Sequence, residues 1–320
     1  MKNIRWGILG TARIADEQLI PALKMTPGAE LIAVASRNYE KGVAFGEKHN
    51  IPRIYDDYET LLQDVDVDAV YIPLPNHLHA EWTIKAARHG KHVLCEKPAA
   101  LTAPQAEEMI QICEDNHVLF MEAFMYQFHP QWKRLKELID NREIGDIQLI
   151  NASFSFLLEA REDIRLHTDM GGGSLYDLGC YCTHSIGLIA NSDWVQCFAN
   201  ATHRQGVDGS TTATMKFKNG IVAHFDCSFQ VPYRQRVEVC GSEGSMVISY
   251  PFRADMGIPK LIVSGRNGVY EETFEDVNVY KLQLEHFQTC ILEQSLPHVS
   301  KVQTINNMKM IDELYRSSRT

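Results

Sequence analysis

IRWGILGTARIADEQLIPALKM, residues 4–25, predicts a buried strand, a tight turn and a helix in immediate succession. This is the context of a dinucleotide fingerprint, in which the first position makes the turn, the second approaches the pyrophosphate and the third packs helix on strand. Gly10 holds the first position, and alanines stand at positions 12 and 15. The alternative is a bare structural turn. If a nucleotide binds, we expect the turn residues Gly10, Thr11, Ala12, Arg13 and Ile14 to contact it.

The same alternation continues to residue 122. Short apolar runs predict buried strands: IRWGIL, LIAVAS, AVYIPL, HVLCE and VLFMEA. Amphipathic stretches lie between them, such as AEWTIKAARHG and PQAEEMIQICEDN. Strands alternating with helices indicate an α/β, doubly wound parallel sheet, so with the fingerprint we expect residues 1–122 to be a dinucleotide-binding Rossmann domain.

A different pattern begins near Asp146. Apolar and polar residues alternate with period two in INASFSF, TATMKF, IVAHFDCSF, RVEVCG and SMVISY, separated by turns such as KNG and GSEG. Two helical stretches, YKLQLEHFQTCILEQ and MKMIDELYRS, close the chain. We therefore expect residues 123–320 to form an α+β domain with a large, mostly antiparallel open sheet.

The composition excludes several classes of protein. The 31 basic and 41 acidic side chains give a formal charge of −10, which argues against nucleic acid or an anionic membrane as a partner. No apolar run approaches a membrane span of roughly 20 residues or a secretory signal. The 8 cysteines form no CxxC pair, which favours a reduced, cytoplasmic protein. His77 and His79 have no cysteine or carboxylate at ligand spacing, so we expect no metal.

The end of the second strand predicts the cofactor. An acidic residue here bonds the ribose 2′-hydroxyl of NAD, whereas an arginine accommodates the 2′-phosphate of NADP. This chain has Ser36 and Arg37, with Lys41 one turn later. We expect these three to bind the phosphate of NADP, with NAD as the alternative cofactor and a solvated loop arginine as the alternative interpretation.

Two further strands end in polar residues at the same edge of the sheet. Ligands of doubly wound sheets bind beyond the carboxyl ends of the strands. Lys97 lies at a strand tip, where an ammonium is either a surface residue or part of a site, and Pro98 restricts its backbone. We expect this edge to contact the cofactor through Pro73, Asn76, His79, Glu96 and Lys97.

The second domain contributes a polar helix face. Within MGGGSLYDLGCYCTHSIGLI, the residues Asp177, Tyr181 and His184 are spaced i, i+4 and i+7. They form either one wall of a site or a satisfied buried cluster. A phenol is a weak acid or base at its ordinary pKa of about 10. A nearby ammonium lowers that pKa, and Lys97 could supply it.

Several of these motifs together resemble the Gfo/Idh/MocA oxidoreductases. They are the Gly10–Ala15 turn, the PNHLH segment, Glu96-Lys97-Pro98, MEAFMYQFHP (121–130) and GGGSLYDLGCY (171–181). The resemblance covers essentially the whole chain and is strongest to the branch of dimeric dihydrodiol dehydrogenase, NADP-linked D-xylose dehydrogenase and glucose-fructose oxidoreductase. It implies a Rossmann domain followed by a domain whose large open sheet commonly mediates dimerisation.

The resemblance also implies roles for individual residues. Lys97 matches the family's catalytic lysine, Tyr181 the branch's catalytic tyrosine, and Asp177 the aspartate one turn earlier. In the inositol dehydrogenase branch a histidine stands where Tyr181 is. Two positions depart from the pattern: Ala12 replaces a glycine, and Gln127 stands where arginine is expected.

The expected activity is reversible hydride transfer between NADP and a hydroxyl or carbonyl carbon of a sugar, polyol or diol. Tyr181 is the expected acid/base and Lys97 the group that lowers its pKa. Substrate contacts are expected from Asp177, His184, Tyr126, His129 and Arg165. The expected partners are a small sugar-like molecule and, by the resemblance, further copies of the chain in a homodimer or higher oligomer. The alternatives are an inositol-dehydrogenase-like enzyme, a non-catalytic sensor of dinucleotide and sugar, and a structural dimerisation module.

Overall fold

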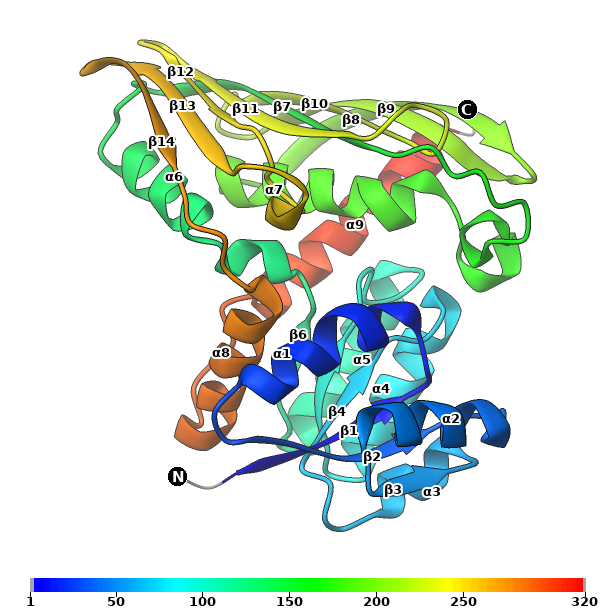
Figure 1. Ribbon diagram of the computed structural model, residues 1–320. Coiled ribbons are helices and arrows are strands. Elements are labelled where there is room, and N and C mark those ends of the chain that lie inside the picture. Colours follow the sequence, from blue (N-terminus) through cyan, green and yellow to red (C-terminus); the bar gives the residue numbers. More distant parts are fainter. Residues whose placement is uncertain (1–2, 319–320) are drawn as a thin grey trace. The chain divides into compact units, whose positions relative to one another are not determined.

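The computed structural model describes residues 3–318 and contains two β-sheets, each built from its own part of the chain (Figure 1). Among the described residues, the first sheet has six strands in the order β3-β2-β1-β4-β5-β6, and its neighbouring strands pair in parallel. This is the strand order of a dinucleotide-binding Rossmann fold. The α/β sheet expected from the alternation is therefore confirmed. The strands are β1 (Ile4–Leu9), β2 (Ala29–Ala35), β3 (Arg53–Tyr55), β4 (Ala69–Ile72), β5 (His92–Cys95) and β6 (Phe120–Glu122).

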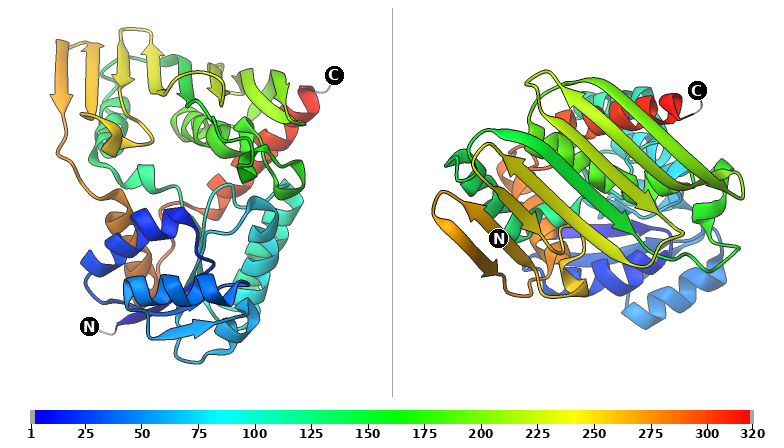
Figure 2. Two further views of the ribbon diagram at one scale, coloured as in Figure 1. Left: turned by 45° about the vertical axis from the view of Figure 1, so that its right-hand side comes forward. Right: turned by 90° about the horizontal axis from the view of Figure 1, so that it is seen from above.

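Helices cover both faces of this sheet, which explains why its strands are continuous apolar runs (Figures 1 and 2). α4 packs on α5, and α1 packs on α8. Asn38, Asp57 and Thr102 each cap a helix by accepting a backbone N–H three residues later. The helices are α1 (Ile20–Met25), α2 (Tyr39–His49), α3 (Tyr58–Gln63), α4 (His79–Arg88), α5 (Ala103–Asp115) and α8 (Val279–Glu293).

The chain forms two compact units that differ in two respects from a division at residue 122. The first unit runs to Met125 and also includes Asn278–Ile305, whereas the second comprises Tyr126–Val277 and the chain from Asn306 on. Within the first unit, Trp6 Nε1 donates to Gln288 Oε1 at 3.1 Å, and its ring lies 5.9 Å from that of Phe287. The apolar face of α8 is thus buried against the Rossmann sheet, a pairing across 282 residues that the local pattern does not reveal.

The second sheet has eight strands in the order β14-β13-β12-β11-β7-β10-β9-β8. Within the part of the chain that the structure describes, β7 and β10 pair in parallel and the other neighbouring strands pair antiparallel, so the mostly antiparallel sheet is confirmed. The strands are β7 (Ile147–Ser155), β8 (Trp194–Arg204), β9 (Val207–Phe217), β10 (Val222–Ser228), β11 (Arg234–Gly241), β12 (Ser245–Ile248), β13 (Lys260–Gly265) and β14 (Gly268–Thr273).

One face of the eight-stranded sheet packs on helices within the second unit, and the strands lie over them in the view from above (Figure 2). These helices are α6 (Pro130–Asp140), α7 (Cys180–Ala190) and the second-unit part of α9 (Lys301–Ser317). Thr183 in α7 donates to Asn307 in α9 at 2.7 Å. The opposite face is polar and carries a hollow of about 540 Å³ lined by side chains such as Asn151, Thr212 and His224. Within residues 3–318 no helix combines the length and hydropathy required to span a bilayer.

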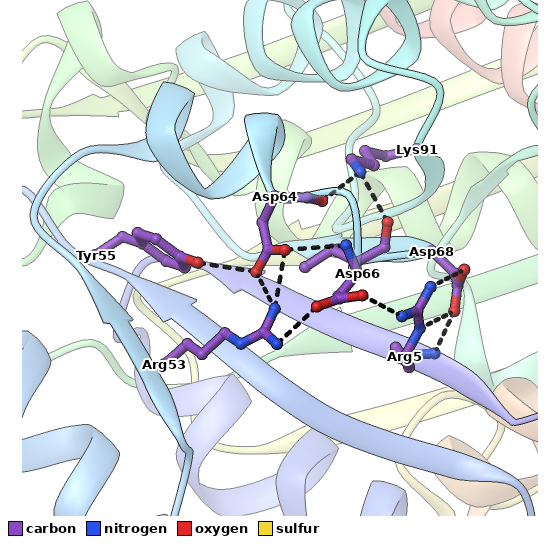
Figure 3. Close-up of polar contacts among 8 residues, drawn as sticks. Arg5, Arg53, Tyr55, Asp64, Asp66, Asp68 and Lys91 are labelled. Carbon is purple, nitrogen blue, oxygen red and sulfur yellow. Dashed lines mark hydrogen bonds and ion pairs between the residues drawn. The ribbon is translucent and has the colours of Figure 1, made fainter.

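A polar network joins the amino ends of the Rossmann strands, at the edge opposite the Gly10 turn (Figure 3). Asp64 accepts from both Arg53 (2.7 Å) and Tyr55 Oη (2.8 Å), and Arg5 pairs with Asp66 and Asp68. Lys91 Nζ donates to the carbonyl oxygens of Asp64 and Val67. Burial opposes ionisation of Asp64, but hydrogen bonds from Arg53, the Asp66 amide and Tyr55 outweigh it and lower its pKa below the ordinary value.

This network is expected to make stability fall in acid. Because the folded pKa of Asp64 is lowered, its contribution is present above the unfolded pKa of about 3.9 and is lost as pH falls through the folded value. Asp64→Ala should lower the free energy of unfolding at pH 7 by about 1–3 kcal/mol, because it removes the acceptor of Tyr55 Oη and one of the two carboxylates that Arg53 bonds. Asp66→Ala is the matched control with a smaller expected effect, since Asp66 is 43% exposed and Asp64 only 8%. Urea unfolding at pH 7 and pH 3.5 measures both variants, and equal losses would contradict this account.

Candidate active site

The first βα turn has the geometry of a phosphate-binding turn. Gly10 has a φ of +103°, a conformation that favours glycine, and its N–H donates to the Ala35 carbonyl at 2.8 Å. A Cβ at this position would lie 3.1 Å from Leu74. The Ala12 carbonyl accepts from Ala15 N, which starts a π-helical turn (Ala15–Leu19) ahead of α1. Thr11 to Ile14 therefore lie together in the turn, where the fingerprint predicts them, and Ala15 is buried as expected of the packing position.

The expected cofactor-selecting residues also lie together. Ser36 follows β2 directly and is buried, whereas Arg37 and Lys41 are exposed beside the start of α2. Within the described chain, neither cation forms an ion pair with a carboxylate. Burial raises the pKa of Tyr58, and Arg37 acts in the opposite direction through its guanidinium. The same Tyr58 hydroxyl lies 3.8 Å from a Cβ placed on Gly10, so Arg37 neighbours the phosphate turn.

The loops after β4 and β5 are joined by His79, which is fully buried. Its Nδ1 contacts the Pro98 carbonyl and its Nε2 the Leu74 carbonyl, both at 2.7 Å. Burial lowers the pKa of His79 to about 4, although both carbonyl contacts favour the charged ring. In this structure His79 holds two turns together, and contact with a cofactor stays a prediction. Pro73 is buried and Asn76 half-buried in the same segment.

Lys97 is half-buried in the turn after β5, and the Lys97–Pro98 peptide bond is cis. The preceding residue, Glu96, accepts from Tyr71 Oη at 2.6 Å. A second carboxyl, Glu122, accepts the Ala99 N–H at 2.9 Å. Sequence reasoning did not assign a role to Tyr71 or Glu122. An acid closing the apolar run VLFME was the signal available for Glu122, because an unpaired buried carboxyl is costly.

In the second unit, the three glycines before α7 are explained by close packing. Gly173 has a φ of +129°, and a Cβ there would overlap Asp208 Oδ1 and lie 2.9 Å from Tyr315 Oη. A Cβ on Gly172 would lie 2.5 Å from the Arg165 carbonyl. Asp208, which sequence reasoning missed, is buried and accepts from Ser174 Oγ (2.8 Å), Leu175 N (2.6 Å) and Tyr315 Oη (2.8 Å). Asp208 therefore anchors the segment that leads to Asp177.

Asp177 lies in a π-helical turn (Leu175–Gly179), and Tyr181 and His184 lie in α7 itself. The single α-helical face expected from their spacing is thus interrupted between Asp177 and Tyr181. Asp177 Oδ2 accepts from Arg165 Nε at 2.8 Å, and Arg165 also pairs with Asp163. The predicted site residues Asp177 and Arg165 are therefore direct partners.

Tyr181 and His184 are 6% and 2% exposed. The Tyr181 ring packs among Phe154, Phe252 and Tyr126, with ring centroids 5.4–5.9 Å apart. His184 Nε2 accepts from Gln127 Nε2 at 3.3 Å, so its protonated Nδ1 donates to Tyr126 Oη at 2.7 Å. Gln127, which stands where the family pattern has arginine, thus contacts His184, a residue predicted to bind substrate.

His129 caps α6, where its Nδ1 accepts from Gln131 N at 3.3 Å. It is 1% exposed, and burial lowers its pKa to about 4. A substrate contact by His129 or by the buried Tyr126 stays a prediction and requires side chains to move. No group of three or more His, Cys, Asp or Glu residues in positions 3–318 is arranged to hold a metal ion.

Comparison with known proteins decides the family. Residues 4–124 match the profile of an oxidoreductase family with an NAD-binding Rossmann fold, and residues 132–247 match the Gfo/Idh/MocA C-terminal domain. The chain belongs to the Gfo/Idh/MocA oxidoreductase family. It is accordingly an NAD(P)-dependent oxidoreductase, and the resemblance of its motifs is confirmed.

Named relatives extend over nearly the full chain. An NADP-linked D-xylose 1-dehydrogenase of Haloferax volcanii is 36% identical over 98% of this chain and 97% of that protein. A trans-1,2-dihydrobenzene-1,2-diol dehydrogenase of Xenopus tropicalis is 28% identical over 90% of this chain and 89% of that protein. The 3-ketoreductase KijD10 of Actinomadura kijaniata, solved with NADP and TDP-benzene, superposes with a TM-score of 0.91 at 29% identity, over 99% of this chain and 98% of that one. Its solved structures include variants with a tyrosine changed to phenylalanine and a lysine changed to alanine.

The residues of this Gfo/Idh/MocA protein fit a dinucleotide. Gly10 contributes no side chain to the turn, and the exposed Arg37 and Lys41 supply positive charge at the end of β2.

Proposed function

We propose that this protein is an NADP-dependent dehydrogenase or reductase acting on a hydroxyl or carbonyl carbon of a sugar, polyol or diol. The observation that carries the proposal is the full-length similarity to an NADP-linked D-xylose dehydrogenase together with Arg37 at the end of β2. NAD-selective sites place an acidic side chain there.

Bound NADP supplies the hydride chemistry, which the protein residues alone cannot perform. Gly10, Thr11, Ala12, Arg13 and Ile14 would bind the pyrophosphate, and Ser36, Arg37 and Lys41 the 2′-phosphate. The strand ends would hold the remainder of the cofactor through Pro73, Asn76, His79, Glu96 and Lys97.

In the proposed mechanism, the Tyr181 hydroxyl transfers a proton to or from the reacting substrate oxygen. Lys97 binds that oxygen and stabilises the phenolate, which lowers the pKa of the tyrosine. Asp177, held by Arg165, and His184, held by Tyr126 and Gln127, orient the substrate hydroxyls. His129 supports the same region as the cap of α6.

The test is absorbance at the nicotinamide band during incubation of the protein with NADP⁺ and a panel of aldoses, diols and inositols. The expected result is that an aldose or a diol reduces NADP⁺ and the absorbance of the nicotinamide band rises. Turnover of inositols alone would favour the inositol-dehydrogenase alternative. Cofactor binding without turnover of any compound would favour the sensor.

Replacing Arg37 should change cofactor preference. Arg37→Ala removes a charge-assisted hydrogen bond of about 1.5–3 kcal/mol, so KM for NADP should rise roughly 10- to 100-fold while KM for NAD stays unchanged. Arg88→Ala, an exposed arginine at the end of α4, is the matched control. Parallel initial rates with the two cofactors measure the effect, and an equal rise for both would refute the 2′-phosphate contact.

We further propose a cytoplasmic homodimer. All 8 cysteines are free thiols, as expected in a reducing compartment. The face of the eight-stranded sheet that carries the hollow, with Phe198 60% exposed on it, offers the surface for a second copy.

A further inference from the structure

Glu122 is a buried carboxyl that the proposed mechanism does not use. It closes β6, is 0% exposed and stands opposite Cys95 in the β5–β6 pairing. The turn Glu96–Ala99, which carries Lys97, begins directly after Cys95. Glu122 Oε1 accepts the Ala99 N–H at 2.9 Å, so this carboxyl holds the far end of the turn.

The second carboxyl oxygen of Glu122, Oε2, is not held by a hydrogen bond of this kind. Within the described residues, Glu122 Oε2 and the Oγ1 of the buried Thr304 form no hydrogen bond of normal geometry, although the hydroxyl lies near enough to the carboxyl to act on it electrostatically. Burial raises the pKa of Glu122 to about 7, whereas the Thr304 hydroxyl, the Ala99 amide and the Lys97 ammonium favour its ionised form. The carboxyl is therefore poised to exchange a proton near neutral pH within electrostatic reach of Lys97.

A purely structural role accounts poorly for this arrangement. One neutral acceptor would suffice for the Ala99 N–H, and a buried ionisable group with an unpartnered oxygen destabilises the fold. We propose that Glu122 is a positioning residue for Lys97, fixing its turn through Ala99 and stabilising its ammonium through charge. The inference rests on the role of Lys97 given under the proposed function.

The groups that act on Glu122 come from two elements. The end of β5 and its turn contribute Cys95, Glu96 and Lys97, and α9 contributes Thr304. Glu96 disfavours the ionised form of Glu122, while Lys97 carries the positive charge that favours it. Electrostatic attraction is mutual, so ionised Glu122 stabilises the Lys97 ammonium in turn.

Infrared titration of the full-length protein tests this coupling without substrate. A protonated carboxyl band should disappear near pH 7 in the wild type and be missing in Glu122→Gln. In Lys97→Ala the same titration should move to higher pH, because the cation that favours the carboxylate is gone. An unchanged midpoint in Lys97→Ala would overturn the coupling.

Kinetics with NADP⁺ and the compound turned over in the absorbance assay test the consequence for catalysis. Glu122→Gln keeps an oxygen for the Ala99 N–H but loses the charge, so kcat should fall about tenfold, the equivalent of a one-unit pKa change, with KM for NADP unchanged. Glu122→Leu loses both the acceptor for the Ala99 N–H and the charge, so its kcat should fall further than that of Glu122→Gln. If Glu122→Leu does not fold, Glu122→Gln still decides the question.

Two failures are distinguishable. Wild-type kcat in Glu122→Gln, beside an inactive Lys97→Ala, would overturn the role of Glu122 alone. Wild-type kcat in Lys97→Ala would overturn the role of Lys97 in the proposed function, and this inference with it.

Discussion

Tyr181→Phe should lower kcat by about 10²- to 10⁴-fold, the usual contribution of a general acid or base, while NADP binding is retained. The variant removes only the hydroxyl, and the ring keeps its contacts with Phe154, Phe252 and Tyr126. A thermal unfolding midpoint close to that of the wild type would assign the loss to chemistry. Steady-state kinetics, cofactor fluorescence and thermal unfolding of the same preparation measure the three quantities.

The matched control is Tyr270→Phe. Tyr270 lies in β14, and none of the proposed site residues belongs to that strand. It should retain wild-type kcat. If Tyr181→Phe keeps full turnover while His184→Ala abolishes it, the proton is handled by the histidine, and chemistry like that of the inositol dehydrogenases becomes the better account.

Gly173→Ala should strongly destabilise the segment that leads to Asp177. The added Cβ would require a non-glycine residue at a φ of +129° and would overlap Asp208 Oδ1. Asp208 cannot retreat freely, because Ser174, Leu175 and Tyr315 all donate to it. Backbone strain and overpacking together should lower the free energy of unfolding by about 2–5 kcal/mol. Activity should fall as well, since the Gly173 carbonyl accepts the Asp177 N–H at 3.1 Å.

Gly220→Ala separates strain from overlap. Gly220 also has a positive φ, +91°, but nothing lies within 4 Å of a Cβ placed on it. Gly220→Ala should lower the free energy of unfolding by only the strain of a non-glycine residue at positive φ, about 1–2 kcal/mol, and leave kcat unchanged. Urea unfolding of both variants gives the comparison, and equal losses would show that the contact with Asp208 is easily relieved.

Much of the fold follows from local sequence patterns. Continuous apolar runs predicted buried parallel strands, and period-two alternation predicted a half-exposed antiparallel sheet; both are confirmed. The short β3 and the strands β8, β13 and β14 were not predicted. β3 has only three residues, too few for a periodic signal, and β14 is largely exposed.

Local sequence features placed part of the candidate site. Gly10 in its turn, Arg37 after β2 and Lys97 before Pro98 are local features, and the structure places each at the carboxyl end of a parallel strand. The interruption between Asp177 and Tyr181 was not predictable, because helical spacing assumes 3.6 residues per turn and a π-helical turn departs from it.

By itself, the sequence determined the two fold classes, the family and the residue types that can bind a dinucleotide, because periodicity, turn chemistry and family motifs are all properties of short segments. Only the tertiary structure decided that α8 packs on the first sheet, that Asp208 requires a glycine at position 173 and that Glu122 holds the turn of Lys97. Each of these contacts joins residues 23 or more positions apart, and such partners are selected by the packing of whole elements.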